Sequence, residues 1–144
     1  MGTVKVEIVN KSKNKLPEYQ SSGAVGMDLF ADSSSVLQPG DRVLMPTGIV
    51  IAVPEGYEGQ IRTRSGRCNK EGLVVLNSPG TIDPDYRGEI GVILYNAGKK
   101  SITVNRGERI AQLVLSKVEH IDWVPVASLD PTERGTAGFG SSGK

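Results

Sequence analysis

Short apolar stretches alternate with turn residues along most of this chain, and that pattern predicts an all-β protein. Residues 4–9 alternate weakly between apolar and polar side chains, and residues 27–31 form a second apolar stretch. Both stretches predict strands. Three more strand-like pieces lie within residues 36–53, and the turns beside them each hold a proline and a glycine. Turns at such short intervals are typical of a sandwich or a barrel.

One short helix is predicted among the strands. A strand over residues 60–63 leads into a helix over residues 67–71. Ser65 can cap the start of this helix, and Gly72 can end it. The hydroxyl, the free backbone N–H groups of a helix start and the adjacent arginine make Arg64-Ser65-Gly66 a candidate phosphate-binding segment.

Two further strands are predicted over residues 101–104 and 110–115, after which the pattern weakens. Arg109 and Gln112 are three positions apart at the start of the second strand. In a regular strand they point to opposite faces. We therefore expect one of them to face a ligand and the other to pair on the surface.

The stretch from residue 72 to residue 96 carries the densest candidate chemistry. It reads as strands over residues 73–76 and 90–95, joined by a connection rich in carboxylates, with an amide and a phenol. A simple hairpin needs only about two to five loop residues, so this longer connection is expected to bind something. Pro84 biases Asp83 toward an extended backbone, which suits a positioned acid or base.

Composition and charge argue against several classes of protein. With 144 residues the chain is long enough for one domain with a core. A net charge of +1 gives no general attraction to nucleic acid or anionic membranes, so a phosphate ligand would need locally placed cations. Cys68 is the one cysteine, which excludes an internal disulfide and a multi-cysteine metal site. His120 is the one histidine, and because no Ser-His-Asp spacing accompanies it, we assign it no catalytic role. The sequence has neither a membrane span nor a signal-peptide pattern, so we expect a cytoplasmic protein.

The end of the chain has the composition of a flexible linker, because glycine and serine dominate it after Pro131. Arg134 adds a positive charge there, and Phe139 adds a ring that can stack on a planar base. We therefore divide the chain into an all-β core, residues 1–130, and a C-terminal arm, residues 131–144, with the composition of a segment that becomes ordered on its ligand.

Five motifs across nearly the whole chain resemble those of the trimeric all-β dUTP pyrophosphatases (dUTPases). They are the segments at residues 26–29, 64–66, 80–88, 106–113 and 134–141. One such match would be weak, but five in the family's order and spacing are specific. The resemblance implies a jelly-roll or distorted β-barrel subunit, of the dUTPase-like β-clip type. It also implies a homotrimer with shared active sites and a C-terminal arm.

The activity implied by the resemblance is hydrolysis of dUTP to dUMP and pyrophosphate, by attack of water on the α-phosphorus. This reaction keeps uracil out of DNA and supplies dUMP for thymidylate synthesis. Asp83 would activate the water with help from Gln112, and Tyr86 would stack under the deoxyribose and refuse a 2′-hydroxyl. The other implied substrate-binding residues are Arg64, Ser65 and Gly66 at the phosphates, Asn77, Gly80, Thr81, Ile82 and Gly91 at the base, and Arg134, Phe139, Gly140 and Ser141 in the arm.

The implied cofactor is Mg²⁺, held mainly by the three phosphates of the substrate, with Asp28 at most reaching it through water. The implied partners are dUTP, dUMP, pyrophosphate and further copies of this chain, with no nucleic acid and no membrane. The chain departs from the family pattern at Thr63, at Arg67-Cys68 and at Ala137, where glycine is frequent. Ala137 would restrict the arm if that position needs a positive φ.

Two other functions fit parts of the pattern. A dCTP deaminase of the same fold would use a glutamate base where this chain has Asp83. A jelly-roll protein that binds a nucleotide without turnover would need no aligned base, so the combination of Asp83, Tyr86 and Phe139 disfavours it. Release of pyrophosphate from dUTP, release of ammonia, or neither would distinguish the three.

Overall fold

The computed structural model describes residues 2–143, and Met1 and Lys144, at the ends of the predicted core and arm, lie outside that range. The predicted all-β fold class is confirmed, since the described residues form eleven strands and one short helix. In chain order these are β1 (Glu7–Asn10), β2 (Met27–Phe30), β3 (Ser35–Leu37), β4 (Arg42–Pro46), β5 (Ile49–Ala52), β6 (Tyr57–Arg62), α1 (Ser65–Glu71), β7 (Leu73–Val75), β8 (Gly80–Ile82), β9 (Gly91–Asn96), β10 (Ile102–Val104) and β11 (Arg109–Lys117).

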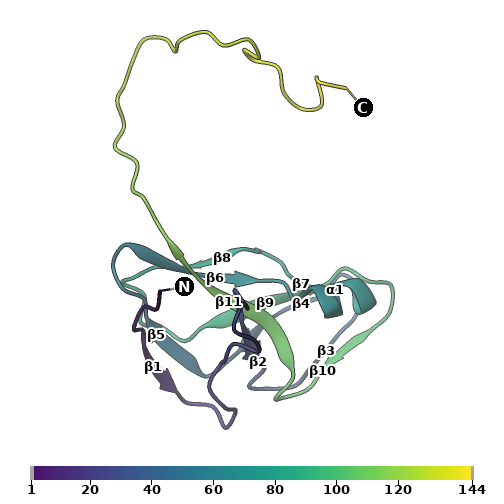
Figure 1. Cartoon of the computed structure of the whole chain (residues 1–144). Coiled ribbons are helices and arrows are strands. Elements are labelled where there is room, and N and C mark those ends of the chain that lie inside the picture. The colour runs from purple at the N-terminus through teal and green to yellow at the C-terminus, as the bar shows by residue number, and fades with distance from the viewer. Residues whose placement is uncertain (1, 144) are drawn as a thin grey trace.

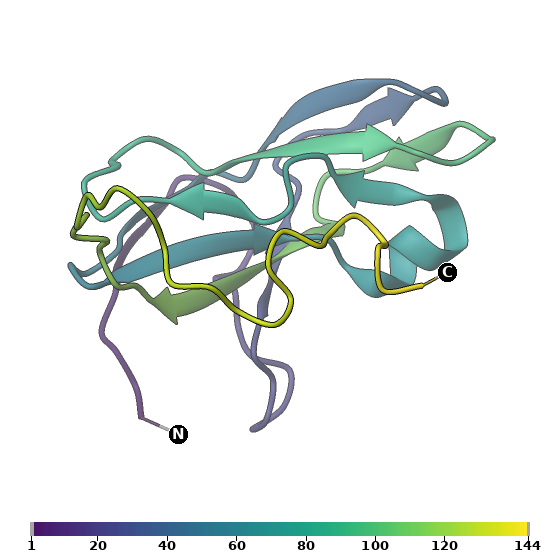
Figure 2. The same cartoon turned by 90° about the horizontal axis from the view of Figure 1, so that it is seen from above.

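The strands pair antiparallel in four small sheets that enclose one core (Figures 1 and 2). A four-stranded sheet has the order β2-β11-β6-β8, and a three-stranded sheet has the order β4-β9-β7. The pairs β1-β5 and β10-β3 complete the body. Alternate side chains point inward, so Ile49 and Ile51 of β5 and Val92 and Leu94 of β9 are buried while their neighbours are not.

The predicted helix and its ends are partly correct. Helix α1 begins at Ser65, two residues before the predicted start, and it ends at Gly72 in the left-handed conformation, with φ 80°, as predicted. The prediction that Ser65 caps the helix is wrong, because Arg64 occupies the N-cap position and makes no side-chain capping hydrogen bond. With seven residues, α1 is not long enough to cross a membrane, and no other helix occurs in residues 2–143.

The connection after β7 is not the continuous loop that its turn residues predict. β7 and β9 do pair with each other, but the chain between them forms β8, which pairs with β6 in the other sheet. The polar residues of this connection are therefore held by a strand at one edge of the four-stranded sheet. They do not belong to a free hairpin loop.

A long C-terminal segment, residues 118–143, leaves the body after β11 and arches away from it (Figure 1). Val118 donates a backbone hydrogen bond to the carbonyl of Gly56. The hydrogen bonds found for residues 119–143 all join residues within that stretch. The division between residues 130 and 131 into core and arm stays a prediction.

Candidate active site

A buried carboxylate with two arginines forms the first group of candidate site residues. Asp28 of β2 is 6% exposed. Its Oδ1 accepts a hydrogen bond from Nε of Arg64 at 2.9 Å, and its Oδ2 lies 3.7 Å from Nη1 of Arg109. A carboxylate removed from water needs such partners to remain charged. The pairing turns two guanidinium groups from distant parts of the sequence toward one point.

Arg64 reaches Asp28 because the chain changes direction there. Its backbone is extended, with φ −84° and ψ 127°, between the end of β6 and the first turn of α1. Ser65 and Gly66 follow as exposed residues at the start of the helix. A Cβ added at Gly66 would meet no atom within 4 Å, so the surface above this turn is open to a ligand.

Gln112 joins the same group by strand pairing. It is the cross-strand partner of Asp28 on one side and of Arg62 on the other. A Cβ added at Gly26 would lie 3.4 Å from Oε1 of Gln112, so the glycine leaves space for the amide. The predicted opposite orientations of Arg109 and Gln112 are wrong. The register shifts between Arg109 and Ala111, which breaks the alternation and lets Arg109 approach Asp28 too.

The second group lies after β8 and centres on Asp83 and Tyr86. Asp83 is exposed directly after the strand, and its carbonyl accepts the backbone N–H of Tyr86 at 3.2 Å. The phenol of Tyr86 donates to the carbonyl of Glu89 at 2.9 Å. A Cβ at Gly88 would lie 2.3 Å from that phenol oxygen, so only glycine lets the ring take this position. Tyr86 is thereby fixed while 45% of it stays exposed.

The predicted base-binding residues lie around β8 and β9, but they are not all exposed. Thr81 is exposed, whereas Ile82 is 6% exposed, so its side chain belongs to the core and it could offer a ligand its backbone only. The amide nitrogen of Asn77 would lie 3.2 Å from a Cβ at Gly80, which brings Asn77 against the strand. Gly91 begins β9, where a Cβ would lie 2.7 Å from Cδ1 of Leu44.

Strand order separates the two groups within one chain. β2, which carries Asp28, and β8, which leads to Asp83, are the two edges of the four-stranded sheet. Adjacent strands are about 4.8 Å apart, so three steps across the sheet amount to about 14 Å. The structure therefore brings Asp28, Arg64 and Gln112 together but does not bring Asp83 to them.

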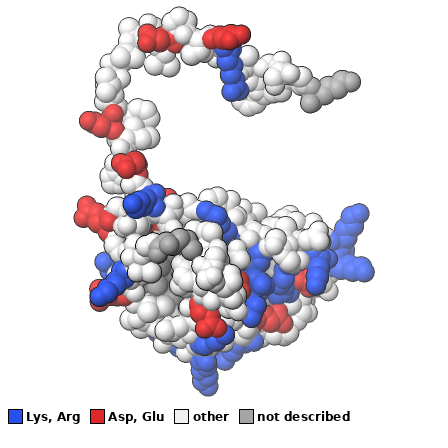
Figure 3. Space-filling model, viewed as in Figure 1, with Lys and Arg blue, Asp and Glu red and all other residues white. Residues whose placement is uncertain are grey.

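The arm residues stand apart from both groups. Nε of Arg134 donates to the carbonyl of Ala137 at 2.8 Å, and Phe139 is fully exposed with φ 52°. Gly135 and Gly140 also have positive φ, whereas Ala137 does not. The alanine therefore imposes no backbone strain in this conformation. Figure 3 shows acidic side chains along the C-terminal segment and basic charge toward its end. In residues 118–143, Arg134 is the one Lys or Arg in the sequence.

Sequence reasoning assigned no role to Arg67 or Glu108, yet both line an open pocket of about 470 Å³ beside Asp28. Its lining residues are Arg64, Arg67, Glu71, Thr103, Glu108 and Arg109. One signal was readable, since Arg67 and Glu71 are four apart on a predicted helix and form an ion pair at 2.7 Å. The contact between Arg67 and Glu108 joins residues 41 apart, so no local pattern marks it.

Comparison with known proteins gives a consistent result. A family model described as dUTPase matches residues 2–143. The deoxyuridine 5′-triphosphate nucleotidohydrolase of Cytophaga hutchinsonii is 56% identical over 144 residues, which cover 99% of this chain and 94% of that protein.

Two solved structures share the fold. The Staphylococcus bacteriophage 80alpha dUTPase with dUPNHPP superposes with a TM-score of 0.85 at 30% identity, covering 99% of this chain and 100% of that chain. A mutant dUTPase from phage phi11 of S. aureus superposes with a TM-score of 0.80 at 23% identity, covering 87% of this chain and 98% of that chain. That structure shows how the phage enzyme coordinates a structural Mg(II) ion.

Proposed function

This chain belongs to the dUTPase family, whose enzyme class is dUTP diphosphatase, and we propose that it hydrolyses dUTP to dUMP and pyrophosphate at a site built from more than one subunit. The observation that carries the proposal is the division of the candidate residues between two edges of one sheet. One edge holds guanidinium groups suited to phosphates, and the other holds an exposed carboxylate beside a fixed aromatic ring.

In the proposed reaction, Asp83 accepts a proton from a water molecule whose oxygen attacks the α-phosphorus. The bond between the α-phosphorus and the bridging oxygen breaks, and pyrophosphate leaves with that oxygen. Asp83 is suited to this task because its carboxylate is exposed at a strand end and makes no side-chain hydrogen bond in the described structure. Gln112 lies beside Asp28 and is proposed to hold the water or the α-phosphate.

Selection of the sugar and base is proposed to lie with Tyr86 and its surroundings. The ring is braced by Gly88 and by the carbonyl of Glu89, so it cannot retreat to admit a 2′-hydroxyl. The backbone of Gly80, Thr81, Ile82 and Gly91, with the amide of Asn77, would read the uracil edge. Because Ile82 is buried and Gly80 and Gly91 are tightly approached, this wall has little freedom to accommodate a methyl group.

The triphosphate is proposed to bind Arg64, Ser65 and Gly66, with Arg109 beside them. In residues 2–143 no group of three or more His, Cys, Asp or Glu residues could hold a metal, and the oxygens of Asp28 face two arginines. These residues fit a Mg²⁺ ion that is held by the substrate's phosphates, with Asp28 reaching it through water. When bound, the ion would neutralise charge on the phosphates.

The homotrimer is proposed because a single chain leaves Asp83 about 14 Å or more from Asp28 by strand count. A neighbouring copy could present its Asp83 edge to the Asp28 edge of this chain. The arm would then close over the shared site, with Phe139 over the uracil and Arg134, Gly140 and Ser141 over the phosphates. From Val118 to Phe139 the chain could span about 70 Å, so the arm can reach a neighbour's site.

The first experiment is to measure Mg²⁺-dependent release of pyrophosphate from dUTP, dCTP, dTTP and UTP. We expect release from dUTP to be about 100-fold faster than from the others. A 2′-hydroxyl or a methyl group would clash with the fixed Tyr86 ring or the backbone around β8, and cytosine would leave polar groups of the site unpaired. Ammonia release from dCTP would instead indicate the deaminase. No turnover of any nucleotide, with dUTP still bound, would indicate a protein that only binds nucleotide.

Phe139→Ala is expected to lower kcat/KM for dUTP about tenfold, because stacking between an aromatic side chain and a base contributes about 1–3 kcal/mol. The residue is fully exposed in this structure, so its removal should leave thermal unfolding unchanged. Phe139→Tyr keeps the ring and serves as the matched control, for which near-native kinetics are expected. Equal kinetics for all three proteins would contradict the proposed closure of the arm.

A further inference from the structure

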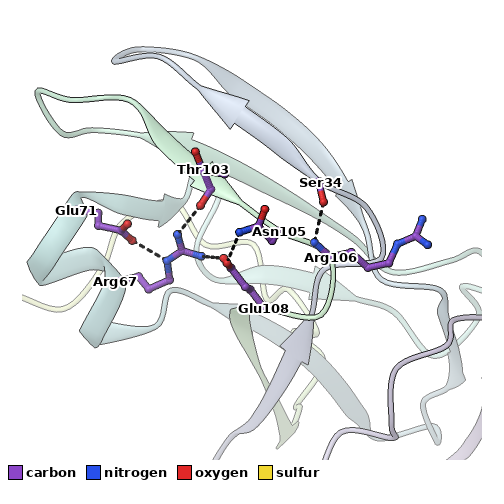
Figure 4. A network of polar contacts seen from close by, with 7 residues as sticks. All are labelled: Ser34, Arg67, Glu71, Thr103, Asn105, Arg106 and Glu108. Atoms are coloured by element: carbon purple, nitrogen blue, oxygen red, sulfur yellow. Dashed lines mark hydrogen bonds and ion pairs between the residues drawn. The ribbon is translucent and has the colours of Figure 1, made fainter.

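Each of the three guanidinium nitrogens of Arg67 donates a hydrogen bond within the protein (Figure 4). Nε pairs with Glu71 at 2.7 Å, and Nη1 pairs with Glu108 at 2.8 Å. Nη2 donates to the carbonyl of Thr103 at 3.1 Å. The other carboxylate oxygen of Glu108 accepts the amide of Asn105 at 2.8 Å. With 18% of its side chain exposed and a contact within the protein from each of its three nitrogens, Arg67 is committed to the protein.

These contacts join two segments that lie beyond the paired ends of β6 and β11. Arg67 lies in the first half of α1, and Glu108 closes the turn between β10 and β11. Among the hydrogen bonds of residues 2–143, those of Arg67 are the ones that link α1 to β10 and to that turn. The far end of α1 is held differently, since Gly72 accepts a backbone hydrogen bond from Ala97.

The two linked segments each carry one of the arginines that face Asp28. Arg64 lies three residues before Arg67, and its carbonyl accepts the backbone N–H of Cys68. Arg109 directly follows Glu108, whose carbonyl accepts the backbone N–H of Ala31 after β2. Pairing between β6 and β11 ends at Arg62 and Gln112, so the contact between Arg67 and Glu108 joins the two arginine-bearing segments beyond the end of that pairing.

Of the three arginines that line the pocket, Arg67 is paired with carboxylates of the protein. Burial alone would lower the pKa of Arg67, but the carboxylates of Glu71 and Glu108 outweigh it and hold that pKa above its ordinary value. Burial alone would raise the pKa of Glu108, but hydrogen bonds from Asn105 and the charge of Arg67 hold it below its ordinary value. The pair stays ionised, which leaves Arg64 and Arg109 as the pocket's cations for a phosphate.

We propose that Arg67, acting through Glu108, is a positioning residue that holds Arg64 and Arg109 at the spacing that the triphosphate requires. This inference rests on the proposed function, because it assigns the phosphates to those two arginines. Arg67 itself would touch neither the substrate nor the water. Its removal should weaken binding of the phosphate chain and leave recognition of the nucleoside unchanged.

The test compares two ligands by isothermal titration calorimetry on the full chain. For Arg67→Gln, we expect the Kd of dUPNHPP with Mg²⁺ to rise about tenfold, while the Kd of dUMP stays within about twofold. Lys70→Gln is the matched control, because it removes one positive charge from the same helix at an exposed residue without a hydrogen bond in the described structure. Both ligands should bind Lys70→Gln as they bind the native protein.

A double-mutant cycle tests whether Arg67 acts through Glu108. If it does, Arg67→Gln combined with Glu108→Gln should weaken dUPNHPP binding no more than Arg67→Gln alone. Glu108→Gln also covers the case in which Arg67→Gln does not fold, since it keeps the shape of the side chain and should raise the Kd of dUPNHPP about threefold by itself.

Two results would overturn the positioning role. One is a native Kd for dUPNHPP in both single variants, and the other is an equal loss for dUPNHPP and dUMP, which would indicate general damage to the fold. Failure of the proposed function is recognised separately, because the native protein would then release no pyrophosphate from dUTP. Normal turnover by the native protein with unchanged binding in the variants refutes only the positioning role.

Discussion

Asp83→Asn is expected to lower kcat for dUTP by about 10³-fold, because the amide cannot accept the proton of the attacking water. The Kd of dUPNHPP should stay close to native, since Asp83 would contact the water and not the nucleotide. Quenched-flow or steady-state measurement of pyrophosphate release gives kcat, and calorimetry gives the Kd. Because Asp83 is exposed after β8, the substitution should leave thermal unfolding unchanged.

Asp85→Asn is the matched control for this prediction. It lies in the same connection, is also exposed, and undergoes the same loss of one charge. We expect its kcat within about twofold of native, because a general base is specific to one position. A comparable loss in both variants would assign the effect to the charge of the whole connection, and near-native turnover of Asp83→Asn would remove Asp83 from the role of base.

Mixing two inactive variants is expected to restore activity, which is the second large effect. Asp83→Asn and Arg64→Gln should each be nearly inactive when assembled alone. If Asp83 and Arg64 of one site come from different subunits, random co-assembly leaves about one quarter of the sites with both native residues. Co-refolded equimolar mixtures should therefore recover about one quarter of native activity, as measured by pyrophosphate release.

The control for this experiment is a mixture assembled from separately refolded variants without exchange, which should stay inactive. A chain that carries both substitutions, co-refolded with native protein, separates complementation from simple dilution of inactive subunits. Light scattering reports the assembled mass of each sample. Recovery no greater than the sum of the two separate variants, or a monomeric mass with full native activity, would contradict the shared site.

The strands and their turns could be predicted from the sequence because local patterns encode them. Proline and glycine mark the turns on either side of β4 and after β5, and Gly72 marks the end of α1. Helix capping was mispredicted because serine is a preferred N-cap residue and arginine is not, whereas Arg64 takes the N-cap position while paired with Asp28, 36 residues earlier. The residue at the N-cap position is therefore Arg64, which is held by Asp28.

Two features of the candidate site depend on pairing between distant segments, and local patterns do not contain them. The bulge at the start of β11 reverses the expected relation between Arg109 and Gln112. The three residues of β8 are bounded by turn signals on both sides, so they read as loop until their pairing with β6 is known. Long-range contacts of this kind decide which residues meet, whereas local composition decides only which residues are available.

The strand order of the four-stranded sheet also has a consequence for how the enzyme responds to dilution. The core of buried apolar residues lies within one chain, so separation of the subunits would not by itself expose it. If each site is shared between subunits as proposed, its two halves would separate when the subunits do. Specific activity would then depend on the concentration of the protein, and at low concentration the chain could be folded but inactive.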